Sequence, residues 1–299
     1  MLRGNVPALL ELLALERIDD LLFLGRSPEG RDGRVYGGQV AAQAVLAAAQ
    51  TIEDGWPLHS LHGYFLRPAD PRRPLLFMVE STRTGRSFAT RRVVARQVGR
   101  AVFSMDAGFQ QRETGLEHAS SAPSVPGPES LKTHRQWLAE FAERNPERAG
   151  DIDLGPRPFD FRWTPELDEE AEHRAQPPEQ FCWFRLARPP APSELARFEA
   201  LPPATLQAAL LVYASDHTIL DTALRPHWGD IEFGSMQVAS LDHALWLHAD
   251  VDTSEWLLFA QDAPSSAGAR GYSRGEVFTR DGRLVASVMQ ESLMRERKG

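Results

Sequence analysis

The sequence predicts one carboxylate in a buried position, away from solvent. Asp216 follows residues 203–214, a run of apolar and helix-favouring residues, and so lies near the C-terminal end of an expected buried helix. Burial and the negative end of a helix dipole both disfavour a charged carboxylate, so both would raise the pKa of Asp216. A carboxylate of raised pKa is a better general base. The alternative is an Asp that only accepts local hydrogen bonds, and the residues alone leave both open.

A second polar side chain lies on an apolar strand face. Gln290 is in the last expected strand, 283–294, and alternate residues of a strand share one face. Its face is otherwise largely apolar: Leu284, Ala286, Val288, Ser292 and Met294. A buried amide must find hydrogen-bond partners or cost free energy. Gln290 is therefore either part of a site or a core residue bonded to the backbone. With a base, such a group could orient a water or stabilise an oxyanion.

Several groups could bind an anionic ligand. Gly37 and Gly38 open the first expected helix, where free N–H groups could receive an oxyanion or a phosphate; the alternative is that a tight turn requires these glycines. His59 could face a cleft, although a strand histidine commonly makes a structural hydrogen bond. Arg91 and Arg270 could meet phosphates, although most arginines serve only the surface. Gly38, His59, Arg91 and Arg270 are the candidate substrate-binding residues.

The sequence context excludes a serine-hydrolase site and gives no sign of a metal or cofactor site. Residues 271–275, GYSRG, fit the nucleophile elbow of serine hydrolases, but that elbow needs a following helix and a downstream histidine. Strand-like residues follow instead, and the last histidine, His248, precedes the motif. The histidines lack zinc-site spacing, and no phosphate-loop or dinucleotide motif is present, so we expect no metal and no cofactor. We expect the single cysteine, Cys182, to be a buried thiol.

The bulk composition describes an acidic chain without disulfides. Its 299 residues carry a formal net charge of −8, which disfavours general binding to nucleic acid or anionic membranes. No stretch approaches the roughly 18 apolar residues that a membrane span needs. Residues 6–22 predict an amphipathic helix and not a signal peptide. With one cysteine, no intramolecular disulfide can form, and we expect a cytoplasmic location.

The chain repeats one pattern on either side of a proline-rich segment. Residues 60–70 match 240–250 at an offset of 180, and two further short matches follow at 182 and 183. Each half begins with an apolar helix, at 37–52 and 203–214. Strands are then expected at 59–66, 74–80, 88–96 and 101–109, and at 236–248, 256–263, 271–279 and 283–294. Between Ser121 and Thr205 lie 14 of the 22 prolines, which predicts a packed connector.

An enclosed helix followed by an antiparallel meander indicates a sheet wrapped around a helix, the hotdog architecture. We therefore predict an α+β double hotdog whose two sheets pair into one continuous sheet. The expected units are an N-terminal hotdog at 1–120, the connector at 121–202 and a C-terminal hotdog at 203–299.

At the level of motifs, the chain resembles the acyl-CoA thioesterase II family of double-hotdog enzymes. The resemblance covers both halves and fails mainly in the connector. It is carried by LERI at 15–18, VYGGQV at 35–40, HSLHGYFLRP at 59–68, GRSFATRRV at 85–93, YASD at 213–216, SLDHALW at 240–246 and VASVMQE at 285–291.

The resemblance implies hydrolysis of acyl-CoA, with a role in fatty acid metabolism. The family is similar in using an Asp, a Thr or Ser, and a Gln to activate one water. Those positions match Asp216, Ser240 and Gln290. Relatives often carry Thr where this chain has Ser240, so the stiff β-branched rotamer is lost. The resemblance also implies a homodimer or homotetramer.

Two other functions stay open at this point. A hotdog enoyl-CoA hydratase would share the fold, but residues 215–218 lack the Asn and Pro that surround the Asp and His of such enzymes. A non-catalytic acyl-CoA binder would bind the ligand without releasing a free thiol.

Overall fold

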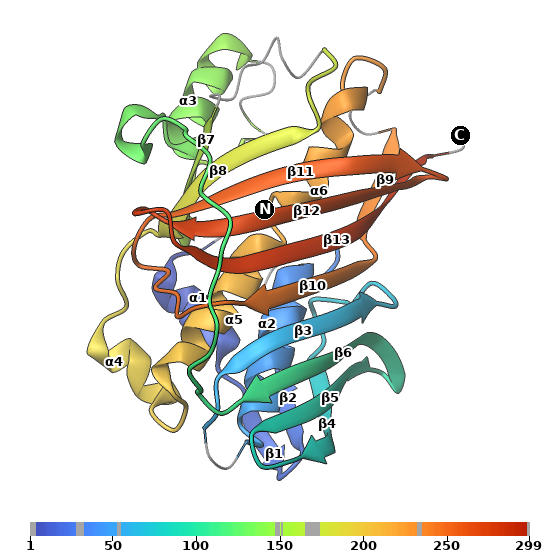
Figure 1. Cartoon of the computed structure of the whole chain (residues 1–299). Helices are drawn as coiled ribbons and strands as arrows, with labels where there is room; N and C mark the ends of the chain where they lie inside the picture. The colour runs from blue at the N-terminus through green and yellow to red at the C-terminus, as the bar shows by residue number, and fades with distance from the viewer. Residues whose placement is uncertain are drawn as a thin grey trace.

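The structure is a curved antiparallel sheet that encloses two long helices (Figure 1). This computed structural model describes residues 4–27, 33–52, 55–146, 150, 152–164, 174–231 and 235–297. The first half contains α1 (Val6–Leu13), β1 (Glu16–Asp19), β2 (Leu22–Gly25), α2 (Gly37–Ala49), β3 (Leu58–Phe65), β4 (Leu75–Thr84), β5 (Phe88–Gln97) and β6 (Arg100–Gln110). The segment after it contains η1 (Pro128–Ser130), α3 (His134–Arg144), β7 (Phe159–Thr164), β8 (Glu179–Leu186), α4 (Pro192–Leu195) and η4 (Ala196–Phe198). The last part contains α5 (Pro203–Ser215), α6 (Ile219–Leu224), η5 (Arg225–His227), β9 (Met236–Ser240), β10 (Asp242–Leu247), β11 (Leu257–Ala267), β12 (Arg270–Thr279) and β13 (Leu284–Glu296).

The two halves join through their sheets, as the sequence predicted. The strand order is β1-β2-β4-β5-β6-β3-β10-β13-β12-β11-β8-β7, with β9 also paired to β13. At the centre, β3 and β10 pair antiparallel, with Leu61 opposite Leu245 (Figure 1). The double hotdog with one continuous sheet is confirmed.

The strand order is the same when read outward from this seam. On one side β3 is followed by β6, β5 and β4, and on the other β10 is followed by β13, β12 and β11. The hairpin β1-β2 then flanks β4 as the hairpin β7-β8 flanks β11. The expected strands of both halves are confirmed, with 236–248 divided at Leu241 into β9 and β10. The expected four-strand meanders are wrong at their first strand: β3 pairs with β6 and β10 with β13, so only β4-β5-β6 and β11-β12-β13 are meanders.

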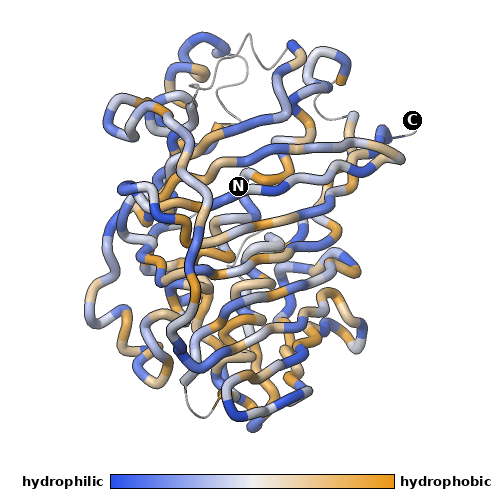
Figure 2. Tube along the Cα trace, viewed as in Figure 1, coloured by the Kyte–Doolittle hydropathy of each residue, from blue (hydrophilic) through white to orange (hydrophobic). Residues whose placement is uncertain are grey.

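The central helices are buried because they are apolar around their whole circumference. Both α2 and α5 consist largely of alanine, leucine and valine, and nearly every residue of each is buried. Figure 2 shows hydrophobic segments gathered in this interior. The helices contact each other antiparallel, so the N-terminus of α2 lies beside the C-terminal end of α5. Among the described residues, no helix is both long and apolar enough to span a membrane.

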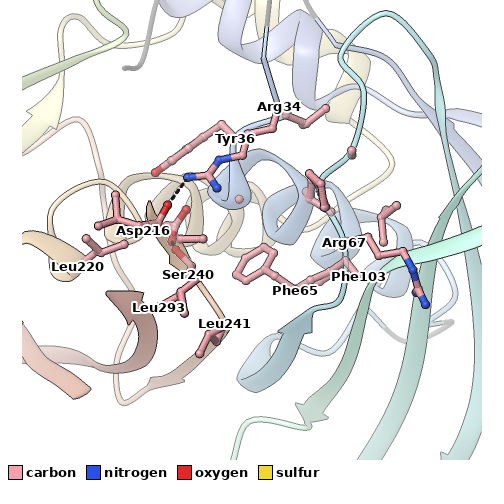
Figure 3. Close-up of a pocket in the computed structure, with 18 of the residues that line it drawn as sticks. Arg34, Tyr36, Phe65, Arg67, Phe103, Asp216, Leu220, Ser240, Leu241 and Leu293 are labelled. Carbon is pink, nitrogen blue, oxygen red and sulfur yellow. Dashed lines mark hydrogen bonds between the residues drawn. The ribbon is translucent and has the colours of Figure 1, made fainter. Parts of the chain in front are cut away.

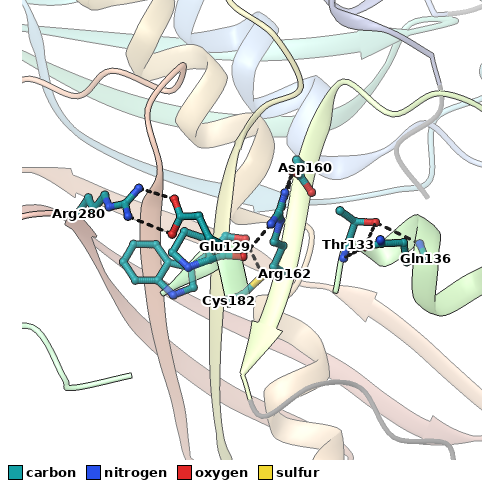
Figure 4. Close-up of polar contacts among 9 residues, drawn as sticks. Glu129, Thr133, Gln136, Asp160, Arg162, Cys182 and Arg280 are labelled. Atoms are coloured by element: carbon teal, nitrogen blue, oxygen red, sulfur yellow. Dashed lines mark hydrogen bonds and ion pairs between the residues drawn. The ribbon is translucent and has the colours of Figure 1, made fainter. Parts of the chain in front are cut away.

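The proline-rich segment is packed onto the second half of the sheet. Its strands β7 and β8 extend that sheet beyond β11. Arg162 on β7 donates to the Pro128 carbonyl at 2.7 Å, and Arg280 pairs with Glu129 (Figure 4). The segment therefore contributes strands as well as a connection, and its boundary at residue 203 stays a prediction.

The N-terminal expectation was wrong beyond Leu13. The helix expected over 6–22 ends there, and β1 and β2 form an antiparallel hairpin instead. The apolar spacing holds only for the first two turns, where Leu9, Leu10 and Leu13 are buried. Beyond them β2 pairs with β4, with Phe23 opposite Phe77, and tertiary pairing overrides the weak helical propensity.

Candidate active site

A cleft of about 1050 Å³ opens where the two halves meet. Its walls come from the N-terminus of α2, the end of β3, the junction of β9 and β10, and the residues after α5 (Figure 3). Asp216 and Ser240 line it together with apolar side chains that include Phe65, Phe103 and Leu293. The cleft thus places a carboxylate and a hydroxyl beside a hydrophobic wall.

Asp216 caps the C-terminal end of α5 and is 92% buried, with 8% relative exposure. Its Oδ2 accepts a hydrogen bond from the Gly38 backbone N–H at 2.8 Å, and its Oδ1 accepts one from the Ser240 hydroxyl at 3.0 Å. The carboxylate therefore spans the two halves of the molecule, since Gly38 belongs to α2. Unused lone pairs on both oxygens remain for a further donor such as water.

Opposing effects set the protonation of Asp216. Burial raises the pKa of its carboxyl above the ordinary value, while His243, Ser240 and the Gly38 N–H favour the ionised form and pull the pKa down. Desolvation is the larger effect, so the pKa is raised overall. The direction is the one that the sequence predicted, and it suits a general base.

Ser240 and Gln290 lie together behind this carboxylate. Ser240 ends β9 directly opposite Ser292 on β13, and Gln290 is two residues before Ser292 on the same strand face. Gln290 Nε2 donates to Ser240 Oγ at 3.0 Å and to Ser292 Oγ at 3.2 Å. The structure brings Asp216, Ser240 and Gln290 into one hydrogen-bonded chain. Of the three, Gln290 does not itself line the cleft.

Two further members of this hydrogen-bonded chain, His243 and Ser215, were not among the site residues expected from the sequence. His243 on β10, fully buried, places Nδ1 2.8 Å from Gln290 Oε1 and Nε2 3.0 Å from Ser215 Oγ. From the sequence it is one of the histidines that lack zinc-site spacing. The sequence did contain a signal for its burial, because alternate residues of a strand share one face and His243 shares its face with the apolar Leu245.

Gly37 and Gly38 permit the close contact between the two central helices. A Cβ on Gly38 would lie 2.6 Å from the Tyr213 carbonyl oxygen, and one on Gly37 would lie 2.8 Å from Asp216 Oδ2. The Gly38 N–H already donates to Asp216. Its expected role towards substrate stays a prediction.

None of the four expected binding residues is in the described lining of the cleft, although Gly38 donates to Asp216, which lines it. His59 lines a separate cavity of about 220 Å³ at the opposite end of the β3–β10 pair. Arg91 is buried and donates to Thr51 Oγ1 at 2.9 Å and to the Arg83 carbonyl at 2.8 Å. Arg270 pairs with Glu291 at 2.7 Å on the sheet surface. Their contacts with substrate remain predictions.

Two other arginines line the cleft. Arg34 and Arg67 are both exposed, and each donates to a backbone carbonyl, of Val238 and Ala101 respectively, at 2.8 Å. Figure 3 shows Arg34 near Asp216 and Arg67 on the far side of Phe65. A guanidinium has five N–H donors, so each retains donors for an anion. Neither was singled out from the sequence.

His217 also lines the cleft, directly after Asp216. Burial lowers the pKa of His217 to about 3, so its ring is neutral at physiological pH. It contributes no positive charge to the cleft near neutrality.

Ser273 and Cys182 both lie outside the described lining of the cleft. Ser273 of GYSRG lies in the middle of β12 and is 1% exposed, so it has no elbow geometry. Cys182 is buried, and burial raises the pKa of its thiol. Within the described part of the chain, no three His, Cys, Asp or Glu residues are grouped to hold a metal ion.

Comparisons with known proteins agree on one family. Residues 27–110 match the family described as acyl-CoA thioesterase N-terminal domain, and residues 195–293 match the family described as acyl-CoA thioesterase. Acyl-CoA thioesterase 2 of Haemophilus influenzae is 36% identical over 96% of each chain. Acyl-coenzyme A thioesterase 8 of Rattus norvegicus is 33% identical over 99% of this chain and 92% of its own.

Solved structures agree in fold over nearly the whole chain. The acyl-CoA thioesterase II TesB2 from Mycobacterium marinum has a TM-score of 0.76 at 36% identity, covering 97% of this chain and 99% of that one. The tesB protein from Mycobacterium avium subs paratuberculosis has a TM-score of 0.77 at 29% identity, covering 98% and 100%.

Proposed function

Because this chain belongs to the acyl-CoA thioesterase II family, we propose that it hydrolyses acyl-CoA to a fatty acid and coenzyme A with a water that Asp216 activates. As a family member the protein is a hydrolase of thioester bonds. The observation that supports the site is the chain of hydrogen bonds from Asp216 through Ser240 to Gln290 at the wall of the cleft between the two halves.

Asp216 acts as the general base. Its ionised carboxylate takes a proton from water, and the oxygen forms a bond to the thioester carbonyl carbon. The tetrahedral oxyanion then collapses, the carbon–sulfur bond breaks, and the proton passes from Asp216 to the departing thiolate. Water and acyl-CoA are consumed, and one carboxylic acid and one thiol are formed.

Ser240 and Gln290 keep the base in place. The Ser240 hydroxyl donates to Asp216 Oδ1, which directs the remaining lone pairs of the carboxylate towards the cleft. Gln290 donates to Ser240 Oγ and fixes the direction of that hydroxyl. The positive end of the α2 dipole, beside the carboxylate, stabilises the negative charge that develops on the carbonyl oxygen.

Activity of site variants tests these roles. Free coenzyme A, detected with a thiol reagent, is measured across acyl chain lengths for Asp216→Ala, Ser240→Ala and Gln290→Ala. We expect Asp216→Ala to lower kcat by about 100-fold or more and the other two by about tenfold. Ser273→Ala is the matched control, because Ser273 is buried opposite Gln290 and its hydroxyl has no partner in the described structure.

The result also separates the alternatives. Wild-type activity in both Asp216→Ala and Gln290→Ala would refute the assignment. A binder would release no thiol even as the wild type, and a hydratase would consume the double bond of an enoyl-CoA without releasing thiol.

Arg34 and Arg67 are proposed to bind the phosphates of coenzyme A. They are the guanidinium groups of the described cleft lining, and phosphate prefers such donors. We expect Arg67→Ala to raise KM for acyl-CoA without changing KM for an acyl-pantetheine, which lacks the nucleotide. Arg188→Ala, on a remote ion pair, is the control, and Arg270→Ala tests the position expected from the sequence. An equal KM increase for both substrates would contradict this role.

A further inference from the structure

A fully buried histidine continues the catalytic hydrogen-bond chain away from the cleft. Gln290, His243 and Ser215 are each at most 1% exposed, and none of them lines the cleft. We propose that His243 is a positioning residue of the active site: it fixes the amide of Gln290 so that its N–H group faces Ser240. This inference rests on the proposed function and adds a residue to it.

The direction of the hydrogen bonds follows from which groups can donate. An amide oxygen only accepts, so His243 Nδ1, 2.8 Å from Gln290 Oε1, must carry a proton and donate it. With the oxygen held there, Gln290 Nε2 faces Ser240 Oγ. Ser240 then accepts from Gln290, and its own proton is left to bond Asp216 Oδ1.

The opposite amide orientation would break this order. If the Gln290 amide turned over, its oxygen would face the Ser240 hydroxyl and compete with Asp216 for the same proton. Asp216 would lose a donor that favours its ionised form. His243 therefore decides, through Gln290, whether the Ser240 proton stabilises the base.

The histidine ring is itself held at both ends. Its Nε2 lies 3.0 Å from Ser215 Oγ, and the Ser215 hydroxyl in turn donates to the Val212 carbonyl within α5 at 3.1 Å. Ser215 is the last residue of α5 and precedes Asp216 in the chain. β10, which carries His243, pairs with β13, which carries Gln290. The chain of hydrogen bonds therefore ends at Ser215, the residue before Asp216. It links strands β10 and β13 to the C-terminal end of α5.

Two substitutions of the histidine separate donation from packing. Asparagine can place its side-chain nitrogen where Nδ1 lies and donate to Gln290, whereas leucine fills the space without a donor. We expect His243→Leu to lower kcat roughly tenfold with KM unchanged, since a buried acceptor loses its partner. His243→Asn should recover most of that loss. His248→Asn is the control, because His248 follows the same strand and its side chain bonds Ser287 on the strand β13, away from Gln290.

A double substitution tests whether His243 acts through Gln290. In a Gln290→Ala background the amide is gone, so adding His243→Leu should cause no further loss of kcat. A merely structural histidine would lower kcat by the same factor in both backgrounds. Ser215→Ala should follow the same rule with a smaller loss, and it keeps the test valid if His243→Leu does not fold. Thermal melting of every variant identifies those that remain folded.

The outcomes are distinct from those for the proposed function. The inference is overturned if His243→Leu has wild-type kcat, if His243→Asn is as slow as His243→Leu, or if the losses multiply in the Gln290→Ala background. If Asp216→Ala is inactive while His243→Leu is fully active, only the positioning role fails. If Asp216→Ala is fully active, the proposed base fails and the inference falls with it.

Discussion

At the scale of the residue, Asp216 combines close hydrogen bonding with the raised pKa that a general base needs. Two donors, the Gly38 N–H and the Ser240 hydroxyl, favour its ionised form, yet burial raises the pKa of the carboxyl overall. A fully solvated Asp would be a weaker base, and an unbonded buried one would be neutral at pH 7. The balance depends on each donor, so it can be tested one group at a time.

The pH dependence of catalysis should report this balance. The base works when ionised, so kcat/KM should be level at neutral pH and fall as the pH drops through the raised pKa of Asp216. Ser240→Ala removes a donor to the ionised form and should shift the acid limb to higher pH. Rates of thiol release from pH 4 to 8 measure the limb, with Ser273→Ala as control. An unchanged limb, or one at lower pH, would argue against Asp216 as the titrating base.

At the scale of elements, the site depends on how closely α2 approaches α5. Gly38 faces the Tyr213 carbonyl at the end of α5, and the Tyr36 hydroxyl donates to the same carbonyl at 2.8 Å. This contact brings the N-terminus of α2 against the carboxylate of Asp216. Gly37 and Gly38 begin α2, so the positive end of its dipole lies beside Asp216. The close packing at this position requires residues without a side chain.

Gly38→Ala should therefore damage both stability and activity. The added Cβ would meet the Tyr213 carbonyl oxygen at 2.6 Å and must push the helices apart. We expect a loss of about 1–3 kcal/mol in the free energy of unfolding and a fall in kcat, because Asp216 loses its backbone donor. Guanidinium unfolding and thiol release measure the two effects. Gly115→Ala is the control, since a Cβ there meets nothing within 4 Å. Wild-type values for Gly38→Ala would contradict the close-contact argument.

At the scale of the whole molecule, the seam between β3 and β10 makes two similar units into one body. Leu61 and Leu245 pair across it and are both fully buried. The candidate site draws groups from both sides of this seam, since Gly38 belongs to the first half and Asp216 to the second. The expected homo-oligomer and the cytoplasmic location stay predictions.

Leu245→Ala should weaken the entire fold in one step. Removing a buried leucine typically costs about 2–5 kcal/mol, and the shared seam should make both halves unfold together. Circular dichroism and tryptophan fluorescence, followed during denaturant unfolding, should give one coincident transition at a lower midpoint. Leu76→Ala, at a position 39% exposed, should change the free energy by less than about 0.5 kcal/mol. Two separate transitions would show that the halves unfold independently.

The sequence by itself determined the elements and the plan of the sheet. Apolar periodicity is local, so it identified α2, α5 and the strands of both halves, and the repeated offsets implied two related units. The family motifs pointed to Asp216, Ser240 and Gln290, which the structure brings together. Burial of the carboxylate also followed, because the helix before it is apolar on every side.

Only the tertiary structure decided which distant groups meet. His243 joins Gln290 to Ser215, and Arg91 turns inward to Thr51, because strand register and helix packing set these distances. The N-terminal hairpin likewise forms because β2 pairs with β4, and its own sequence does not predict it. A local pattern fixes which face of an element is apolar. It does not fix the partner on that face, since the partner depends on how elements far apart in the chain pack together.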